Sequence, residues 1–151
     1  TLAAGDVVPL SENVSATVFY PPEDIDVSGD ANAVSMLLRI DYGEASALFT
    51  GDLEMTEEPG PMPDVDVLKV PHHGSSNSSS LMLLHSASPS AAIISAGRNN
   101  PYGHPAEALL ERLEGTGARV FRTDECGAIT ARLYEDGGVS ISTYLLPEDE
   151  A

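Results

Sequence analysis

Apolar residues along this chain recur with two different spacings, which predict strands in some segments and helices in others. Residues 14–20 alternate between apolar and polar positions, a pattern typical of a half-buried strand. Gly43-Glu44 and Asp136-Gly137-Gly138 each separate two apolar runs and predict hairpin turns. Compact apolar runs predict the other strands, at residues 34–42, 45–50, 65–70, 91–95, 119–122, 128–134 and 139–145.

Two segments have the spacing and end signals of helices. Residues 78–86 carry leucines at 81 and 84 behind a start rich in Ser and Asn, which suits capping. In residues 105–114, Pro105 fits the first helical position and Ala108, Leu109 and Leu113 form an apolar stripe. Because strands and helices alternate in the middle of the chain, the predicted fold is α/β (α+β in some schemes), with helices packed on a mixed sheet.

Composition and charge narrow the function classes. The chain has 151 residues, 42% of them hydrophobic, which is enough for a packed core and excludes a disordered chain. No apolar run is long enough to cross a membrane, and the single cysteine, Cys126, excludes a cysteine-rich zinc site. The net charge is −17, which fits a role in solubility or adaptation to high salt. Six of the seven basic residues lie between positions 69 and 132, so a site for an anionic substrate is expected in that stretch.

Residues with reactive side chains follow the predicted strands. Asp52 lies in TGDLE, His72 and His73 lie in PHHGS, and His104 lies in the loop before the second helix. Taken singly, each segment also fits an ordinary turn, a polar loop or a helix cap. Together they follow three separate strands, whose ends could meet at one edge of the sheet. Aspartate and histidine are common ligands of Zn²⁺ and Mn²⁺, so the combination predicts a metal site.

Other polar residues near these segments are candidates for substrate contacts. A cation beside a helix start favours an anion, and the serines that precede the first helix could donate hydroxyls to a phosphate. A nucleotide-binding glycine-rich loop and a serine-hydrolase elbow are both absent from the sequence. The candidate substrate contacts are Lys69, Ser75, Ser76, Arg98, Asn99 and Tyr102.

The succession of GDLE, HHGS and YGHP, in this order, resembles the metallo-β-lactamase-like domain of ComEC-type DNA-internalisation competence proteins. The resemblance covers residues 5–145 and implies an αββα sandwich. It implies that Asp52 is a metal ligand that can bridge two ions, and that His72 and His73 line the metal centre. It leaves open which of the two ligates. It places Asn99, Tyr102 and His104 at the border of the same cleft.

The sequence departs from this family in one respect. All four histidines are at positions 72, 73, 85 and 104, so the leading motif of the superfamily, His-x-His-x-Asp-His, is absent from the chain. In the family this motif lies N-terminal to the segments seen here. We therefore expect residues 1–151 to be the C-terminal half of one domain, inactive alone and completed by the missing N-terminal half. Half a sandwich would expose an apolar face, so self-association is also expected.

The resemblance implies a metal-dependent hydrolase domain for DNA uptake, with two Zn²⁺ or Mn²⁺ ions in the complete domain. The expected reaction is hydrolysis of phosphodiesters in the DNA strand that does not enter the cell, with Asp52 and His73 as catalytic residues. The expected partners are DNA and the membrane channel of the full-length protein, at the outer face of the cytoplasmic membrane. Three alternatives stay open: a superfamily hydrolase acting on a small phosphodiester or lactone, a fold that has lost its metal, and an acidic partner-binding module.

Overall fold

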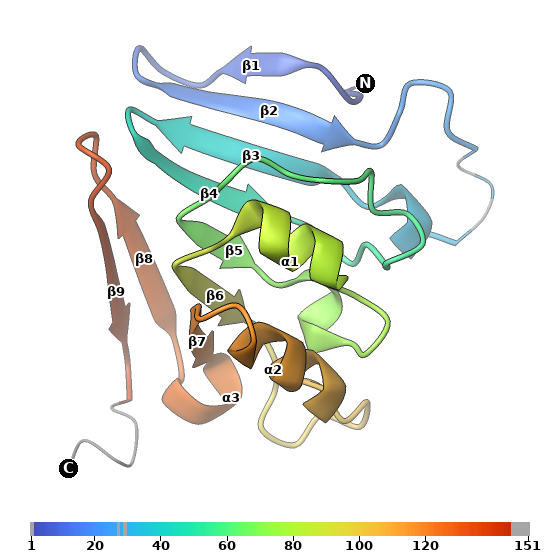
Figure 1. The fold of residues 1–151 in the computed structure, drawn as a ribbon, viewed down its shortest axis with the longest axis vertical. Coiled ribbons are helices and arrows are strands. Elements are labelled where there is room, and N and C mark those ends of the chain that lie inside the picture. The colour runs from blue at the N-terminus through green and yellow to red at the C-terminus, as the bar shows by residue number, and fades with distance from the viewer. Residues whose placement is uncertain (1, 27, 29, 146–151) are drawn as a thin grey trace.

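The computed structural model describes residues 2–26, 28 and 30–145. The largest element of secondary structure in this part of the chain is a seven-stranded sheet (Figure 1). Its strands are β1 (Val7–Pro9), β2 (Val14–Tyr20), β3 (Leu37–Tyr42), β4 (Ala45–Phe49), β5 (Val67–Lys69), β6 (Ala91–Ile94) and β7 (Arg119–Arg122).

The sheet is antiparallel in its first half and parallel in its second. The strands lie in chain order from β1 to β7. Short turns join β1 to β2 and β3 to β4, a longer loop joins β2 to β3, and all three of these strand pairs are antiparallel. From β4 onward each connection crosses over before the next strand, so β4, β5, β6 and β7 run parallel. The carboxyl ends of four adjacent strands therefore lie at the same edge of the sheet.

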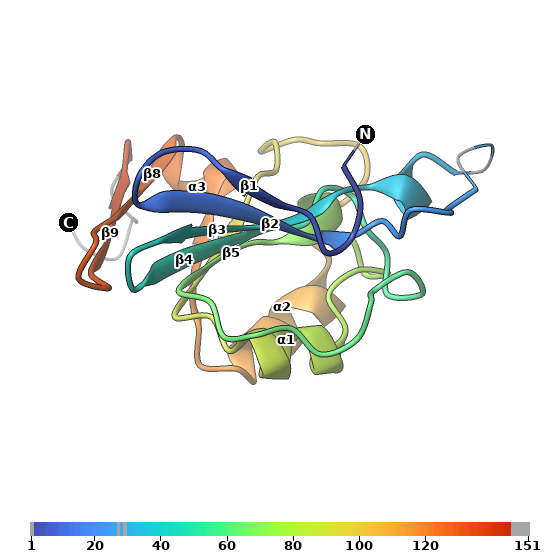
Figure 2. The same ribbon diagram turned by 90° about the horizontal axis from the view of Figure 1, so that it is seen from above.

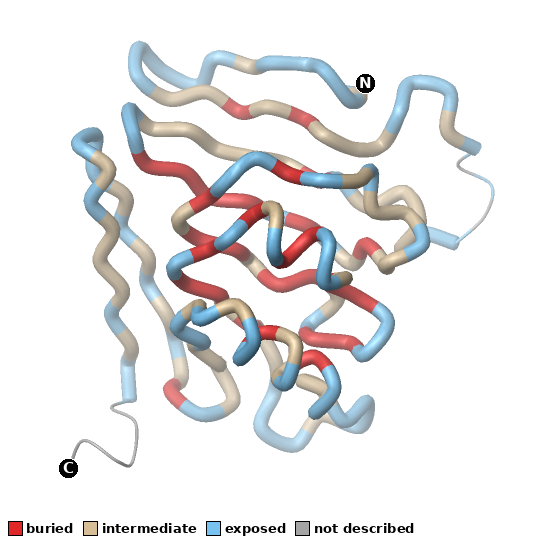
Figure 3. Tube along the Cα trace, in the orientation of Figure 1, coloured by how far each residue is buried: buried red, intermediate tan, exposed pale blue. Residues whose placement is uncertain are grey.

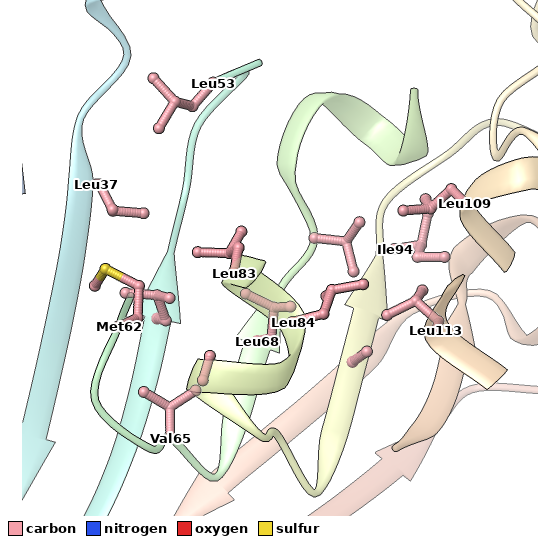
Figure 4. Packing of buried hydrophobic residues seen from close by; sticks show 14 residues of the cluster. Leu37, Leu53, Met62, Val65, Leu68, Leu83, Leu84, Ile94, Leu109 and Leu113 are labelled. Atoms are coloured by element: carbon pink, nitrogen blue, oxygen red, sulfur yellow. The ribbon is translucent and has the colours of Figure 1, made fainter. Parts of the chain in front are cut away.

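Two helices cover one face of this sheet (Figure 2). They are α1 (Leu81–Ala87) and α2 (Glu107–Glu114). Four leucine side chains on these helices are fully buried and join the hydrophobic cluster on this face (Figure 4): Leu83, Leu84, Leu109 and Leu113. Figure 3 shows that the buried residues concentrate in the central strands and on the inner sides of the helices. Each buried leucine contributes about 1.5–3 kcal/mol relative to leaving it exposed.

The opposite face of the sheet is also apolar, although both longer helices lie on the other side. The strand register shows which residues lie on this face. Leu37, Leu48 and Leu68 point into the helix-covered core, so the residues next to them along each strand point to the opposite face. Phe49 on this face is 48% exposed. The apolar side chains that share the face include Leu38, Ile40, Phe49, Val67, Ile93 and Phe121.

A separate hairpin follows the sheet. After the single-turn helix α3 (Thr123–Cys126), strands β8 (Ile129–Leu133) and β9 (Val139–Thr143) pair with each other and lie beside the sheet in Figure 1. The backbone N–H of Glu44 donates to the carbonyl of Glu135, which ties the hairpin turn to the turn between β3 and β4. Two 3₁₀ turns, η1 (Asn32–Val34) and η2 (Pro71–Gly74), complete the described elements.

The predicted fold class is confirmed, and the differences lie mainly at element boundaries. The strand predicted at 34–42 begins at Leu37, because the 3₁₀ turn η1 ends at Val34 and Ser35 and Met36 intervene. The helix predicted from Pro105 begins at Glu107, since Ala106 is extended and serves as its N-terminal cap residue. Ala108 was expected in its apolar stripe but is exposed. Strand β1 was not predicted from the pattern. Within the described part of the chain, every helix is too short or too polar to cross a membrane.

The half-exposed Phe49, on the apolar face opposite the helices, predicts self-association of the 151-residue chain. Phe49→Glu should shift the chain toward monomer in sedimentation velocity, because it places a charge on this face at a position already half exposed. Tyr144→Glu is the matched control, since Tyr144 is exposed near the end of the β9 hairpin. Association that persists unchanged in Phe49→Glu would contradict the role of this face.

Candidate metal and substrate site

The candidate residues meet at the edge of the sheet where β4, β5 and β6 end. Asp52 follows β4, and His72 and His73 lie in the 3₁₀ turn η2 directly after β5. The backbone N–H of His72 donates to the carbonyl of Gly51 at 3.0 Å, which joins these two loops. The backbone N–H of Ala106 donates to the carbonyl of Gly74, so the loop before α2 is fixed to the same turn. Three segments distant in sequence thus form one rigid cluster.

His73 faces the carboxylate of Asp52. Its Nε2 lies 3.7 Å from Oδ1 of Asp52, and both side chains are about half exposed. Its Nδ1 lies 2.8 Å from the carbonyl oxygen of Ser95, at the end of β6. When a neutral ring donates Nδ1–H to a carbonyl, its Nε2 lone pair is available, which is how metal-binding histidines are commonly held. The carbonyl that follows β6 therefore holds the ring of His73 so that its other nitrogen faces the carboxylate that follows β4.

His72 forms a second imidazole–carboxylate pair. Its Nδ1 lies 3.7 Å from Oε1 of Glu54, which is beyond hydrogen-bonding distance. The His72 ring also meets the ring of His104 edge to face, with centroids 5.9 Å apart. Nδ1 of His72 and Nδ1 of His104 are both buried without a hydrogen-bond partner among the described residues. Buried nitrogen atoms without partners are uncommon, and they mark this place as one that could accept a ligand.

Sequence reasoning did not assign a role to Glu54. The signal that could have found it is its spacing, because Glu54 stands two residues after Asp52 in the same segment, TGDLE. The two carboxylates face different histidines of the pair, Asp52 facing His73 and Glu54 facing His72. Each of the two adjacent histidines therefore has its own carboxylate.

The backbone of the histidine pair is strained. His72 and His73 have φ values of 49° and 54°, in the left-handed region, which costs a residue with a side chain about 1–2 kcal/mol each. Strain of this kind persists where the surrounding structure fixes it and is frequent at functional sites. Gly74 follows with φ of 89°, and a Cβ there would lie 2.7 Å from Cβ of Pro105. The absence of a side chain at Gly74 lets the start of α2 approach the histidines.

Burial and nearby charges lower the pKa of two basic groups at the site. Burial, together with the nearby rings of His72 and His73, lowers the pKa of His104 below its ordinary value. Burial also lowers the pKa of the Lys69 ammonium, and the negative charge of Asp52 opposes that shift. Lys69 donates from Nζ to the carbonyl of Val70, so its charge lies within the protein near Asp52.

The candidate substrate residues surround the site unevenly. Ser76, Arg98, Asn99 and Tyr102 are exposed, whereas Ser75 is buried. Nε of Arg98 donates to the carbonyl of Asp124, which directs this cation toward α3. The Oγ of Ser75 accepts from the backbone N–H of Asn77 and so stabilises its own loop. Tyr102 stacks on His104, with ring centroids 6.0 Å apart and planes 20° apart.

The serine-rich helix start was expected to bind phosphate, and in the structure a carboxylate lies there. The carboxylate of Glu58 accepts hydrogen bonds from the backbone N–H of Ser80 at 3.0 Å and from the Ser80 hydroxyl. A carboxylate therefore occupies the position at the start of α1 that an anion would need. Arg112 donates to the carbonyls of Ser76, Ser78 and Ser79, so the serine loop is tied to α2.

The residues present fit part of a metal site. Asp52 and His73 approach each other from two strand ends, and His72 and His104 contribute buried nitrogens without partners. In the described ranges, however, the structure holds no cluster of three or more metal-binding side chains. Metal sites in proteins usually use three or four protein ligands. These side chains are suitable metal ligands, but the described residues do not bring three of them together.

The fold and this site define the class of protein. Residues 25–98 match the metallo-beta-lactamase superfamily, and they include Asp52, His72 and His73. The chain belongs to this superfamily.

The chain matches parts of several longer proteins, one of which is named as a competence protein. The chain is 40% identical over 128 residues to ComE operon protein 3 of Bacillus subtilis, which covers 82% of this chain and 16% of the relative. It is 38% identical over 114 residues to competence protein ComA of Neisseria gonorrhoeae, covering 72% of this chain and 16% of that protein. It is 36% identical over 118 residues to recombination protein 2 of Haemophilus influenzae, covering 76% of this chain and 15% of that protein. The resemblance to the competence-protein domain is confirmed, and the chain spans about one sixth of the length of these relatives.

The packing at Gly74 predicts a loss of stability on substitution. Gly74→Ala should lower the free energy of unfolding by about 2–5 kcal/mol, since it combines backbone strain with a clash against Pro105. Gly117→Ala is the matched control, because Gly117 also has a positive φ but has open space around it, so about 1–2 kcal/mol is expected. Urea denaturation measures both, and equal losses would contradict the packing argument.

The lowered pKa of His104 predicts that the metal-free chain loses stability in acid. The folded protein binds this proton less readily than the unfolded chain, so the contribution is present above about pH 6.5 and is lost as the pH falls below it. His104→Gln should flatten the dependence of the urea midpoint on pH between 7.5 and 5. An unchanged dependence in His104→Gln would contradict the assignment.

Proposed function

We propose that this chain is part of a metal-dependent hydrolase that cleaves phosphodiesters of the DNA strand excluded during uptake. The observation that carries the proposal is the approach of Asp52 to His73 at the carboxyl edge of the parallel strands. Open α/β sheets bind their ligands at this edge. The similarity to ComE operon protein 3 and to competence protein ComA supports the setting, and the superfamily match supports hydrolysis assisted by metal.

Asp52 and His73 are the residues of this chain that would hold a divalent cation, either Zn²⁺ or Mn²⁺. Their oxygen and nitrogen atoms are ordinary ligands of both metals. His72 and His104 offer the buried nitrogens nearest to this pair and would ligate or contact the substrate. A bound divalent ion supplies charge neutralisation for a phosphate and acidifies a water molecule.

Each residue of the chain has a separate task in this proposal. The carbonyl of Ser95 fixes the ring of His73, so that Nε2 stays directed at the site. Lys69 lies beneath Asp52 and lowers the electrostatic cost of gathering carboxylates there. Arg98 and Asn99 lie in the exposed loop after β6, where they could contact the phosphates that flank the cleaved bond. Ser76 is exposed beside the histidine turn and could contribute a hydroxyl.

The remaining ligands are proposed to come from another segment of a longer protein. Residues 1–151 would form the C-terminal half of one αββα sandwich, and a preceding segment with His-x-His-x-Asp-His would supply the other half and complete a two-ion site. The apolar face of the sheet opposite the helices supports this arrangement, because a second layer would bury Phe49, which is half exposed. A membrane channel in the same longer protein would place the site at the outer face of the cytoplasmic membrane.

Substitution of Asp52 tests the proposed activity in that longer protein. Asp52→Asn should lower hydrolysis of labelled single-stranded DNA by about 10²-fold or more and reduce the bound Mn²⁺ or Zn²⁺ measured by elemental analysis. Asp64→Asn is the control, because Asp64 is an exposed acid before β5 and away from the site. Assays on a small phosphodiester beside DNA separate a nuclease from another superfamily hydrolase.

Two results would contradict the proposal. If the longer protein binds no metal, the chain belongs to a domain that kept the fold without the reaction. If Asp52→Asn leaves both metal content and hydrolysis unchanged, the assignment of Asp52 is wrong.

A further inference from the structure

A small cavity opens directly beside the His73–Asp52 pair. Its volume is about 220 Å³, and we call it the Tyr102 pocket. Its walls come from the loop after β6 and from the histidine turn. The lining residues are His73, Ser95, Ala96, Gly97, Asn100, Tyr102 and His104. Because His73 both lines this pocket and faces Asp52, an occupant of the pocket would be separated from the proposed metal by one side chain.

Tyr102 is an aromatic residue held out in solvent. It is 79% exposed, yet its ring stacks on His104 with an interplanar angle of 20°. The loop beneath it is fixed, because Asn100 bonds the backbone of His104 on both sides: Nδ2 donates to its carbonyl and Oδ1 accepts from its N–H. An exposed ring on a rigid support presents a flat apolar surface that can stack against another planar group.

Two polar side chains of the pocket wall, His73 and Asn100, already form hydrogen bonds within the protein, whereas Nδ1 of His104 is buried without a partner among the described residues. Besides its bonds to His104, Nδ2 of Asn100 donates to the carbonyl of Gly97, and Nδ1 of His73 bonds the carbonyl of Ser95. An occupant would therefore be held mainly by its flat face and less by hydrogen bonds at its edges. Recognition of this kind tolerates any nucleobase, since every base has a flat aromatic face.

The net charge of the chain also favours binding through a flat face rather than through phosphates. The chain carries a net charge of −17, so attraction between basic side chains and phosphates provides little affinity for a nucleic acid. A strand that binds this chain needs a source of affinity that does not depend on charge. Stacking against an aromatic side chain supplies it and is worth about 5- to 150-fold in affinity per base.

We propose that Tyr102, supported by His104, stacks on one nucleobase of a single-stranded DNA substrate, next to the phosphate that is cleaved, without preference among the four bases. The inference rests on the proposed function for the identity of the substrate. It adds a binding step that positions the strand through a base as well as through its phosphates. Tyr102 is thus a positioning residue.

The chain contains no tryptophan, so Tyr102→Trp creates a single fluorescent reporter in the pocket. The 151-residue chain is titrated with eight-nucleotide single strands of dA, of dT and of abasic sugar-phosphate, all with the same number of phosphates and with EDTA present. We expect saturable quenching by the dA and dT strands, and binding about 5- to 150-fold weaker by the abasic strand. Tyr144→Trp is the control, since Tyr144 is 82% exposed beyond β9 and should give no saturable response.

A second measurement avoids the reporter. Fluorescence anisotropy of a labelled dT strand should show about 5- to 150-fold weaker binding to Tyr102→Ala and binding within about twofold of the original for Tyr102→Phe, which keeps the ring. Equal affinity of Tyr102→Ala and the original chain, or equal affinity for abasic and normal strands, would overturn the inference.

These results are separable from the proposed activity because EDTA removes metal from the binding assay. Stacking at Tyr102 without hydrolysis in the longer protein would leave this inference standing and remove the nuclease. Hydrolysis that depends on Asp52 but strand binding that ignores Tyr102 would do the reverse.

Discussion

The parallel pairing of β4, β5 and β6 is the constraint on which the rest of the structure depends. It brings the loops after these strands to one edge, although Asp52 and His104 are separated by more than fifty positions in the chain. Backbone hydrogen bonds then fix the loops to each other, from His72 to Gly51 and from Ala106 to Gly74. The ring of His73 adds one bond from Nδ1 to the carbonyl of Ser95, which leaves its Nε2 for a ligand.

The buried leucines on the helix side make this edge rigid enough to hold strain. α1 and α2 bury their leucines against the same sheet, and Leu109 lies one turn from the start of α2, where that helix meets Gly74. Packing of this strength can stabilise two consecutive left-handed histidines, which together cost about 2–4 kcal/mol. In exchange, His72 and His73 point to different carboxylates. A regular strand would send alternate side chains to opposite faces of the sheet.

Much of this arrangement could be predicted from strand ends and short motifs. The strand patterns are local, and they predict that Asp52, His72 and His73 follow strand ends, as they do after β4 and β5. The sequence did not indicate that Glu58, more than twenty positions before Ser80, reaches the start of α1 through tertiary packing. Glu54 was overlooked for a similar reason, since its pairing with His72 depends on how two loops fold against each other. Strand β1 is three residues long and forms only by pairing with β2.

Two unfinished features of the described structure have one explanation in the proposed sandwich. The metal-binding set stops short of three ligands, and the apolar side of the sheet that carries Phe49 lacks a covering helix layer. If the other half of the sandwich packs on this face, it would bury Phe49 and bring its own metal ligands to the edge where Asp52 and His73 lie. Metal binding and the association of the halves would then be linked, because an ion held by both halves stabilises only the assembled domain.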